Sequence, residues 1–193
     1  MAVRPIVKYP DPVLLTPTRL VGDITDHIRK LVDDMWETMY DAPGVGLAAN
    51  QIGIPLRLAV IDTRDGEEKP DTGHKIVLVD PVVLETQGTF SEDEGCLSFP
   101  GFTERVETPA WVRVRARDLE GREYEISGDG LFGRALRHET DHLDGVTFID
   151  RLSALKRDLI KRKIRKMRKA GDWPEPEPPA EGEATGRARA DRP

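Results

Sequence analysis

Apolar side chains recur at helical spacing between residues 24 and 39. The steps between them place all of them on one face of an α-helix, and they are Ile24, Ile28, Leu31, Val32, Met35 and Met39. The sequence Asp41-Ala42-Pro43-Gly44 follows directly. Proline and glycine disfavour continuation of a helix. The pattern therefore predicts one amphipathic helix near the N-terminus.

The middle of the chain has the pattern of β-strands. Short runs rich in β-branched residues, each bounded by turn residues, cover 58–61, 76–79 and 81–84. Residues 111–118 alternate apolar and basic side chains, as a half-exposed strand does. After Gly121, residues 124–126 can pair back on them as a hairpin. The charged segment 62–75 between two of the strands is expected to be an exposed loop.

Two further helices are predicted in the last third of the chain. One begins near Asp129 and carries the sequence LFGRALRHETDHL. The other begins near Arg151, and its apolar stripe is Leu152, Leu155, Leu159, Ile160, Ile164 and Met167. Strands clustered between an early helix and late helices favour an α+β fold over alternating βαβ units. We expect small antiparallel or mixed sheets around the helix at 129, with N-terminal and C-terminal helices beside them.

Charge divides the chain into unlike parts. The 193 residues have a net charge of −6, but residues 151–170 contain ten basic side chains and one acidic one. Residues 1–150 are correspondingly acidic, which disfavours DNA binding over most of the surface. We expect a single catalytic domain at 1–169, including a basic helix at 151–169. The segment 170–193 is rich in Pro, Glu and Ala and is expected to be disordered.

The sequence has no recognisable signal for secretion or membrane insertion. No apolar run approaches the roughly 18 residues needed to cross a bilayer. The N-terminal sequence MAVRPIVKYPDP lacks the apolar core of a secretory signal. A single cysteine cannot form an internal disulfide, in keeping with a reducing compartment. We therefore expect a cytoplasmic protein without a membrane partner.

The sequence His138-Glu139-Thr140-Asp141-His142 is an H-E-x-x-H motif. On a helix, residues i and i+4 share a face, so both imidazoles can reach one metal ion. Glu139 could act there as a general base toward a water molecule. Two unrelated histidines on a surface helix are the alternative. With four histidines in the chain, a chance H-E-x-x-H is expected only about 0.01 times.

A catalytic site of this type usually has three protein ligands. No histidine follows His142, and the carboxylates of Asp144 and Asp150 have no recognised ligand spacing. Upstream, the sole cysteine lies in Glu94-Gly95-Cys96-Leu97-Ser98. A lone cysteine is most often a small buried hydrophobe, but the flanking acids and glycine are unusual for a core. Both interpretations of Cys96 stay open on this pattern alone.

A third segment, GVGLAANQ at residues 44–51, consists largely of small side chains. Small residues let another backbone approach closely, and Gln51 can donate an amide N–H. Taken alone, a turn rich in Gly and Ala with one Gln is commonplace.

Together, the three segments GVGLAANQ, EGCLS and HETDH resemble the signature segments of the peptide deformylases, in the same order and at similar separations. YPDPVL near the N-terminus and FPG after the cysteine also resemble that family. The resemblance covers about residues 3–165. It implies hydrolysis of the N-formyl group from nascent chains that begin with formyl-methionine.

The resemblance also implies the roles of individual residues. Cys96, His138 and His142 would hold one divalent metal ion, usually Fe²⁺, with Zn²⁺, Ni²⁺ or Co²⁺ as alternatives. Glu139 would carry the proton, while the Gln51 side-chain amide and the Leu97 backbone N–H would donate to the oxyanion.

Further residues would contact the substrate. By the same resemblance, Gly46 and Leu97 would line its backbone, and Val45 and Leu131 would form the pocket for the methionine side chain. Many family members have Arg where this chain has Thr108, before Pro109. The sequence therefore leaves open whether Glu94 has a basic partner.

The expected partners are N-formyl-methionyl nascent peptides and, through the basic helix 151–169, the ribosome and its RNA. A solvated basic face on an amphipathic helix is the alternative for that helix. Two other functions also fit parts of the pattern, namely an H-E-x-x-H metalloprotease and a catalytically idle ribosome-binding paralogue.

Overall fold

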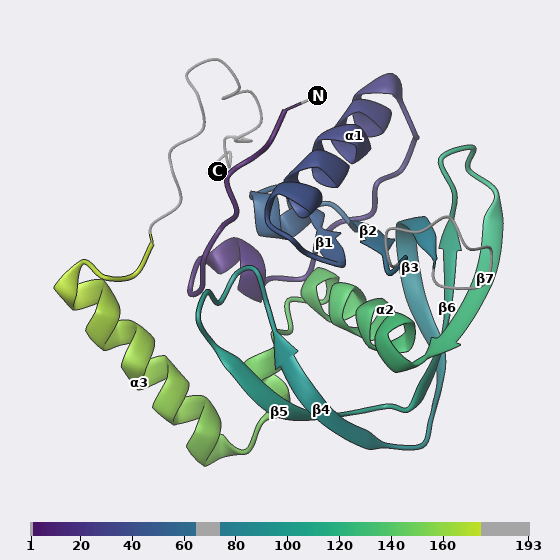
Figure 1. The fold of residues 1–193 in the computed structure, drawn as a ribbon. Helices are drawn as coiled ribbons and strands as arrows, with labels where there is room; N and C mark the ends of the chain where they lie inside the picture. Colours follow the sequence, from purple (N-terminus) through teal and green to yellow (C-terminus); the bar gives the residue numbers. More distant parts are fainter. Residues whose placement is uncertain (1, 65–73, 175–193) are drawn as a thin grey trace, which may run out of the picture.

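The computed structural model describes residues 2–64 and 74–174, and it is an α+β fold (Figure 1). Five strands form an antiparallel sheet in the order β1-β2-β3-β6-β7, and β4 and β5 form a separate hairpin. The strands are β1 (Gly46–Ala48), β2 (Leu58–Asp62), β3 (Lys75–Gln87), β4 (Phe90–Gly95), β5 (Thr103–Thr108), β6 (Trp111–Arg117) and β7 (Glu123–Asp129). The α-helices are α1 (Asp26–Asp41), α2 (Gly130–Leu143) and α3 (Ala154–Ala170), and the 3₁₀ turns are η1 (Pro12–Leu15), η2 (Ala49–Ile52) and η3 (Phe148–Arg151).

The β1–β2 part of the five-stranded sheet is buried on both faces. Successive side chains of a strand point to opposite faces. In β2, Leu58 and Val60 accordingly pack in the cluster formed with α1, while Ala59 and Ile61 pack in the cluster formed with α2. This explains why the sequence of β2 is continuously apolar. The predicted amphipathic helix is confirmed as α1, and its apolar stripe is the face on the sheet.

Helix α2 lies at the centre of the fold, between the large sheet and the β4–β5 hairpin (Figure 1). Four of its apolar side chains pack on the sheet, and they are Phe132, Ala135, Leu136 and Leu143. The polar side of the helix is buried as well, because Arg137, Glu139 and His142 are each less than 5% exposed. A polar helix face that is covered in this way needs partners for every charge.

Helix α3 packs on the rest of the chain along a narrow line. Ile160 and Ile164 are buried in a cluster with the N-terminal segment and β5. Leu155 and Leu159 are 72% and 52% exposed, so the wide apolar stripe predicted for this helix was wrong. The helix starts at Ala154, after the capping side chain of Ser153, and Leu152 lies before it.

The packed chain extends beyond α3. The Trp173 side chain is 4% exposed, its ring lies edge-on to Phe102, and its Nε1 donates a hydrogen bond to the Tyr9 carbonyl over 2.8 Å. The expected start of a disordered tail at residue 170 was therefore wrong. The rest of that predicted tail, 175–193, lies outside the described residues, as does 65–73 of the predicted loop.

The strand predictions need two corrections. The runs 76–79 and 81–84 belong to one strand, β3, in which a register shift accommodates Asp80 and Pro81. The β4–β5 hairpin was not predicted, because its residues are largely polar and lack apolar alternation. Within the described ranges, no helix has the length and apolar character to cross a membrane.

Candidate active site

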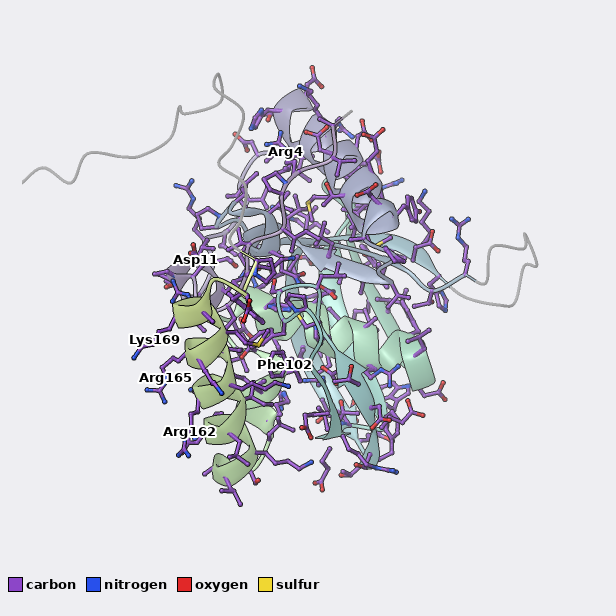
Figure 2. The ribbon with its side chains drawn as sticks, turned by 60° about the vertical axis from the view of Figure 1, so that its left-hand side comes forward. Arg4, Asp11, Phe102, Arg162, Arg165 and Lys169 are labelled. Atoms are coloured by element: carbon purple, nitrogen blue, oxygen red, sulfur yellow. The ribbon has the colours of Figure 1, made fainter. Side chains whose placement is uncertain are left out.

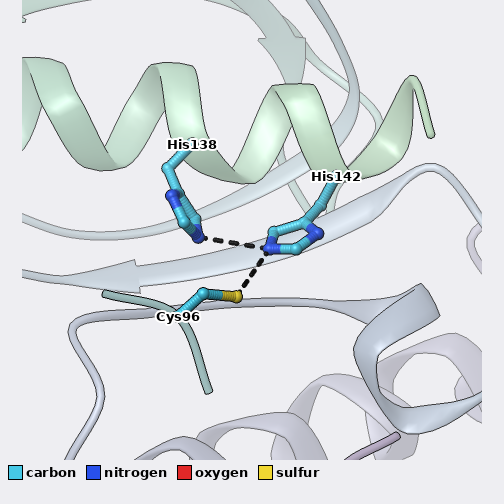
Figure 3. Close-up of side chains that lie close together, drawn as sticks. All are labelled: Cys96, His138 and His142. Carbon is cyan, nitrogen blue, oxygen red and sulfur yellow. Dashed lines mark hydrogen bonds between the residues drawn. The ribbon is translucent and has the colours of Figure 1, made fainter. Parts of the chain in front are cut away.

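The three predicted metal ligands converge at one point between α2 and the end of β4 (Figure 3). His138 and His142 stand one turn apart on α2, and Cys96 directly follows β4. The His142 Nε2 atom lies 3.2 Å from Cys96 Sγ and 3.1 Å from His138 Nε2. All three ligand atoms lie within 4.8 Å of one another.

This donor set fits a divalent metal ion. Metal–sulfur and metal–nitrogen bonds of about 2.3 and 2.0 Å in a tetrahedral site imply ligand–ligand distances of about 3.3–3.6 Å, and the contacts of His142 with Cys96 and His138 are close to this range. Burial lowers the pKa of His142 well below its usual value, and the positive charges of His138 and Arg137 add to the effect. Burial thus favours the neutral form of the His142 ring. It also lowers the pKa of His138, but Cys96 and Glu94 outweigh burial and raise that pKa well above its usual value, so the His138 ring must lose a proton when it binds a metal ion.

Glu94 fixes the ring of His138 from the side away from Cys96. Its Oε1 atom lies 2.6 Å from His138 Nδ1, which leaves Nε2 facing the other two ligands. Burial raises the pKa of Glu94, but His138 and Arg137 outweigh burial and lower it to about 2. The carboxylate is therefore ionised at neutral pH.

Arg137 is the basic partner of Glu94 that the sequence left in question. Its Nη2 atom donates to both carboxylate oxygens of Glu94 at 2.7 Å, and its Nη1 atom donates to Asp141 at 2.5 Å. Thr108 therefore does not leave Glu94 unpaired. Sequence reasoning missed Arg137 in this role, and the only local signal was its i, i+4 spacing to Asp141.

Glu139 is buried beside the three ligands and touches β1. Burial raises the pKa of its carboxyl group to about 7, although His138 acts in the opposite direction. Its Oε2 atom has no hydrogen-bond partner among residues 2–64 and 74–174. A Cβ atom at Gly46 would lie 2.3 Å from Glu139 Oε1, so only glycine leaves room for this carboxylate.

Gln51 faces the same centre from another side. The Gln51 side chain is buried on η2, where its Oε1 atom accepts from the Ala48 N–H. Its Nε2 atom is thereby directed to Cys96 Sγ at 3.5 Å and Ser98 Oγ at 3.3 Å. Leu97 follows the cysteine, and the Lys8 ammonium, absent from the predicted site, donates to its carbonyl over 2.9 Å.

A cleft of about 650 Å³ opens onto these groups. The predicted substrate-binding residues Val45, Gly46, Leu97 and Leu131 all line it. Val45 and Leu131 are each 41% exposed. The cleft thus offers apolar surface next to a cluster of metal-binding and acid–base groups.

An H-E-x-x-H helix, an upstream cysteine and a cleft beside a buried glutamate define a metal-dependent hydrolase. A family profile described as polypeptide deformylase matches residues 3–158. The chain belongs to the polypeptide deformylase family.

Curated and solved relatives agree with this assignment. The chain is 54% identical over 173 residues to a peptide deformylase of Acidobacterium capsulatum, covering 90% of this chain and 100% of that protein. The crystal structure of a peptide deformylase from Legionella pneumophila matches with a TM-score of 0.79 and 42% identity, covering 88% of this chain and 98% of that one. A peptide deformylase from Ehrlichia chaffeensis in complex with actinonin also has a TM-score of 0.79, with 37% identity over 86% of this chain and 98% of that one.

The function predicted from the sequence is thereby confirmed. The protein is a metallo-amidohydrolase that removes the N-formyl group from nascent peptides. A metalloprotease with the same helix motif is not supported.

Proposed function

We propose that this deformylase hydrolyses the formyl–methionine amide at the Cys96, His138 and His142 centre, with one Fe²⁺ ion as the resident metal. A divalent ion held there would supply Lewis-acid activation of water and of the formyl carbonyl. The observation that carries the proposal is the convergence of three ligand atoms within 4.8 Å, beside a buried glutamate and an open cleft.

Glu139 is the proton carrier in this proposal. A carboxyl group with a pKa of about 7 can accept a proton from the attacking water and return it to the leaving amine at neutral pH. Burial between α2 and Gly46 holds the carboxylate at the rim of the cleft. Its Oε2 atom is the one available to the reacting water.

Gln51 and Leu97 stabilise the negative charge that develops on the formyl oxygen. The Gln51 amide is held by Ala48 and aimed at the cysteine sulfur, so its N–H groups are oriented before substrate arrives. The Leu97 backbone N–H is the second donor. Loss of one such donor costs about 10²–10³ in rate.

The cleft recognises the start of the nascent chain. Val45 and Leu131 form the pocket for the methionine side chain, and Gly46 pairs with the substrate backbone as an added strand. The small formyl hydrogen fits the tight space beside Glu139. An N-acetyl analogue should therefore react far more slowly, and comparable turnover of the two would contradict this part.

Two substitutions test the assignment of roles. Glu139→Gln preserves shape and should retain the metal but lose formate release from a formyl-methionyl peptide. Cys96→Ser should lose metal, because a hydroxyl is a poor substitute for thiolate. Loss of metal from Glu139→Gln would instead assign Glu139 a structural role, and wild-type protein without formate release would favour the idle paralogue.

Metal identity requires a separate measurement. An Fe²⁺ site with a thiolate ligand is sensitive to oxidation. Protein purified without oxygen should contain iron and lose activity in air, and Ni²⁺ or Co²⁺ should restore activity in an oxygen-stable form. Stoichiometric zinc and full activity in air would contradict the assignment to iron.

A second proposal concerns helix α3 and the place of action. Figure 2 shows Arg162, Arg165 and Lys169 pointing away from the body of the protein, and all three are exposed. Residues 151–170 hold ten basic side chains and one acidic one. Such a surface suits ribosomal RNA, and the substrate is a nascent chain. We therefore propose that residues 1–169 form one catalytic domain, against which Trp173 also packs, and that this domain meets its substrate at the ribosome in the cytoplasm.

Substitution is a sharper test of this contact than truncation, because α3 also contributes to the core. Arg162, Arg165 and Lys169 changed together to Gln should abolish salt-sensitive co-sedimentation with ribosomes and leave peptide deformylation unchanged. The matched control changes three exposed basic residues elsewhere, Arg19, Lys30 and Arg122. Equal loss in both triple variants would show only a general charge effect.

A further inference from the structure

Arg137 is a fully buried cation inside the motif helix, at a point where burial of a charge is costly. Its side chain is 3% exposed and that of Glu94 is 4% exposed. Stability alone does not explain why this arginine is buried, because a buried ion pair rarely stabilises a fold more than apolar side chains of the same volume do. The position of the pair, directly behind a metal ligand, suggests another role.

The contacts form a chain that ends on His138. Asp141 Oδ2 accepts from Arg137 Nη1 at 2.5 Å, and Arg137 Nη2 donates to Glu94 Oε1 and Oε2 at 2.7 Å. Glu94 Oε1 lies in turn 2.6 Å from His138 Nδ1. Asp141 is held from its other side by Arg151, through two bonds of 2.6 Å.

These hydrogen bonds fix the orientation of the Glu94 carboxylate. A carboxylate on its own can rotate about its terminal bond and offer either oxygen to His138. Because Arg137 bonds both oxygens, it sets the carboxylate plane, and Asp141 sets the guanidinium. The His138 ring then has one orientation in which Nδ1 meets Glu94 and Nε2 meets the other ligands.

We propose that Arg137 is a positioning residue of the metal centre, which acts through Glu94 to hold the His138 ring in its ligating orientation. The inference rests on the deformylase function and on the metal ligands proposed above. Arg137 contacts neither the donor atoms of the metal ligands nor the substrate cleft. Its effect must therefore appear in metal binding and not only in turnover.

The test measures metal affinity directly. The apoprotein of Arg137→Gln is titrated with Co²⁺ in competition with a chromogenic chelator, and the visible Co²⁺ spectrum is recorded. We expect a loss of affinity of 10- to 100-fold, as for other residues that orient a ligating histidine. We also expect a changed Co²⁺ spectrum, because the His138 ring is free to turn.

Arg151→Gln is the matched control, because Arg151 binds the same Asp141 but does not touch Glu94. It should keep Co²⁺ affinity within about threefold of the wild type. Equal affinity losses in Arg137→Gln and Arg151→Gln, or unchanged affinity in both, would overturn the proposal. The first result would indicate a general structural role, and the second would indicate no role at the metal.

Three more variants extend the test, and the first of them serves where Arg137→Gln folds poorly. Arg137→Lys keeps the charge but replaces the two nitrogens that reach Glu94 and Asp141 with one, so affinity should fall and the spectrum should change. The pair Glu94→Gln and Glu94→Gln/Arg137→Gln forms a cycle. Since Arg137 acts through Glu94, the double variant should bind Co²⁺ as weakly as Glu94→Gln alone, and additive losses would overturn the proposal. Failure of deformylation with intact Co²⁺ affinity in Arg137→Lys would count against it too, while leaving the deformylase assignment untouched.

Discussion

Gly46 controls the position of Glu139 through the space that it leaves open. The residue lies on β1, where its backbone is paired with Ile61 of β2. Its backbone does not have a positive φ, so alanine can adopt the same conformation. A Cβ atom there would lie 2.3 Å from Glu139 Oε1, 2.8 Å from Cδ and 2.9 Å from Cγ. Gly46→Ala therefore tests the place of the carboxylate without changing the backbone conformation.

The size of the effect follows from these distances. Ordinary contact with a Cβ atom begins at 3.4 Å, so Oε1 must move by about 1 Å because the paired strand cannot. A displacement of that size at a reacting group costs about 10²-fold in rate. We expect kcat for Gly46→Ala to fall about 100-fold. Metal content should not change, since the Cβ contacts are with Glu139 and not with the three ligands.

The assay is formate release from a formyl-methionyl peptide, with kcat and KM determined separately and metal measured on the same samples. The Glu139→Gln background provides the control, because a carboxylate already removed cannot be displaced. Gly46→Ala should cause no further loss there. Activity within about twofold of the wild type would refute the reasoning. A rise in KM at constant kcat would refute it as well, and would assign Gly46 to substrate pairing alone.

Three further predictions concern stability. Trp173→Ala should lower the free energy of unfolding by about 3 kcal/mol. The measurement is urea denaturation of a chain ending at Pro174. A loss below about 1 kcal/mol would show that the packing on Phe102 contributes little. Burial raises the pKa of Asp34, but hydrogen bonds from Arg4 and the Ala2 N–H outweigh it and lower the pKa below its usual value. The ionised Asp34 therefore stabilises the fold above about pH 4. The difference in urea midpoint between the wild type and Asp34→Asn should narrow as pH falls from 6 to 3, and a constant difference would contradict this. Chelation of the metal should lower Tm, and Zn²⁺ or Co²⁺ should restore it. The reason is that a ligand at 100 times its Kd adds about 2.7 kcal/mol to the free energy of unfolding. Cys96→Ser should show a smaller change in Tm on chelation.

The sequence predicted the helices, and it predicted that the two histidines of α2 lie together, for a physical reason. Helix α1 has a strong 3.6-residue period, and the H-E-x-x-H spacing depends only on helix geometry. The ligand residues His138 and His142 were therefore placed together by local structure alone. Cys96 could be added only through the resemblance of three motifs, because its spacing to the helix contains no geometric information.

Other features depended on tertiary contacts and were not predictable from local pattern. The strand β4 is polar along most of its length, and it is a strand because β5 pairs with its backbone. Leu155 and Leu159 fit a helical stripe, yet α3 meets the core only through its later turns. Trp173 lies in a stretch whose composition is typical of disorder, and only the presence of Phe102 and Tyr9 nearby explains its burial.

The partner of Glu94 shows most clearly where local pattern ends. Arg137 and Asp141 are an i, i+4 pair, which by itself predicts a surface ion pair of small effect. Their burial results from the β4–β5 hairpin, which brings Glu94 from 43 residues upstream. Cys96 lies two residues beyond Glu94 on that same strand end, so one docking event delivers both a ligand and the carboxylate that orients another. The metal centre and the packing of the hairpin on α2 should consequently be coupled, and a change that loosens the hairpin should weaken metal binding even where all three ligands remain.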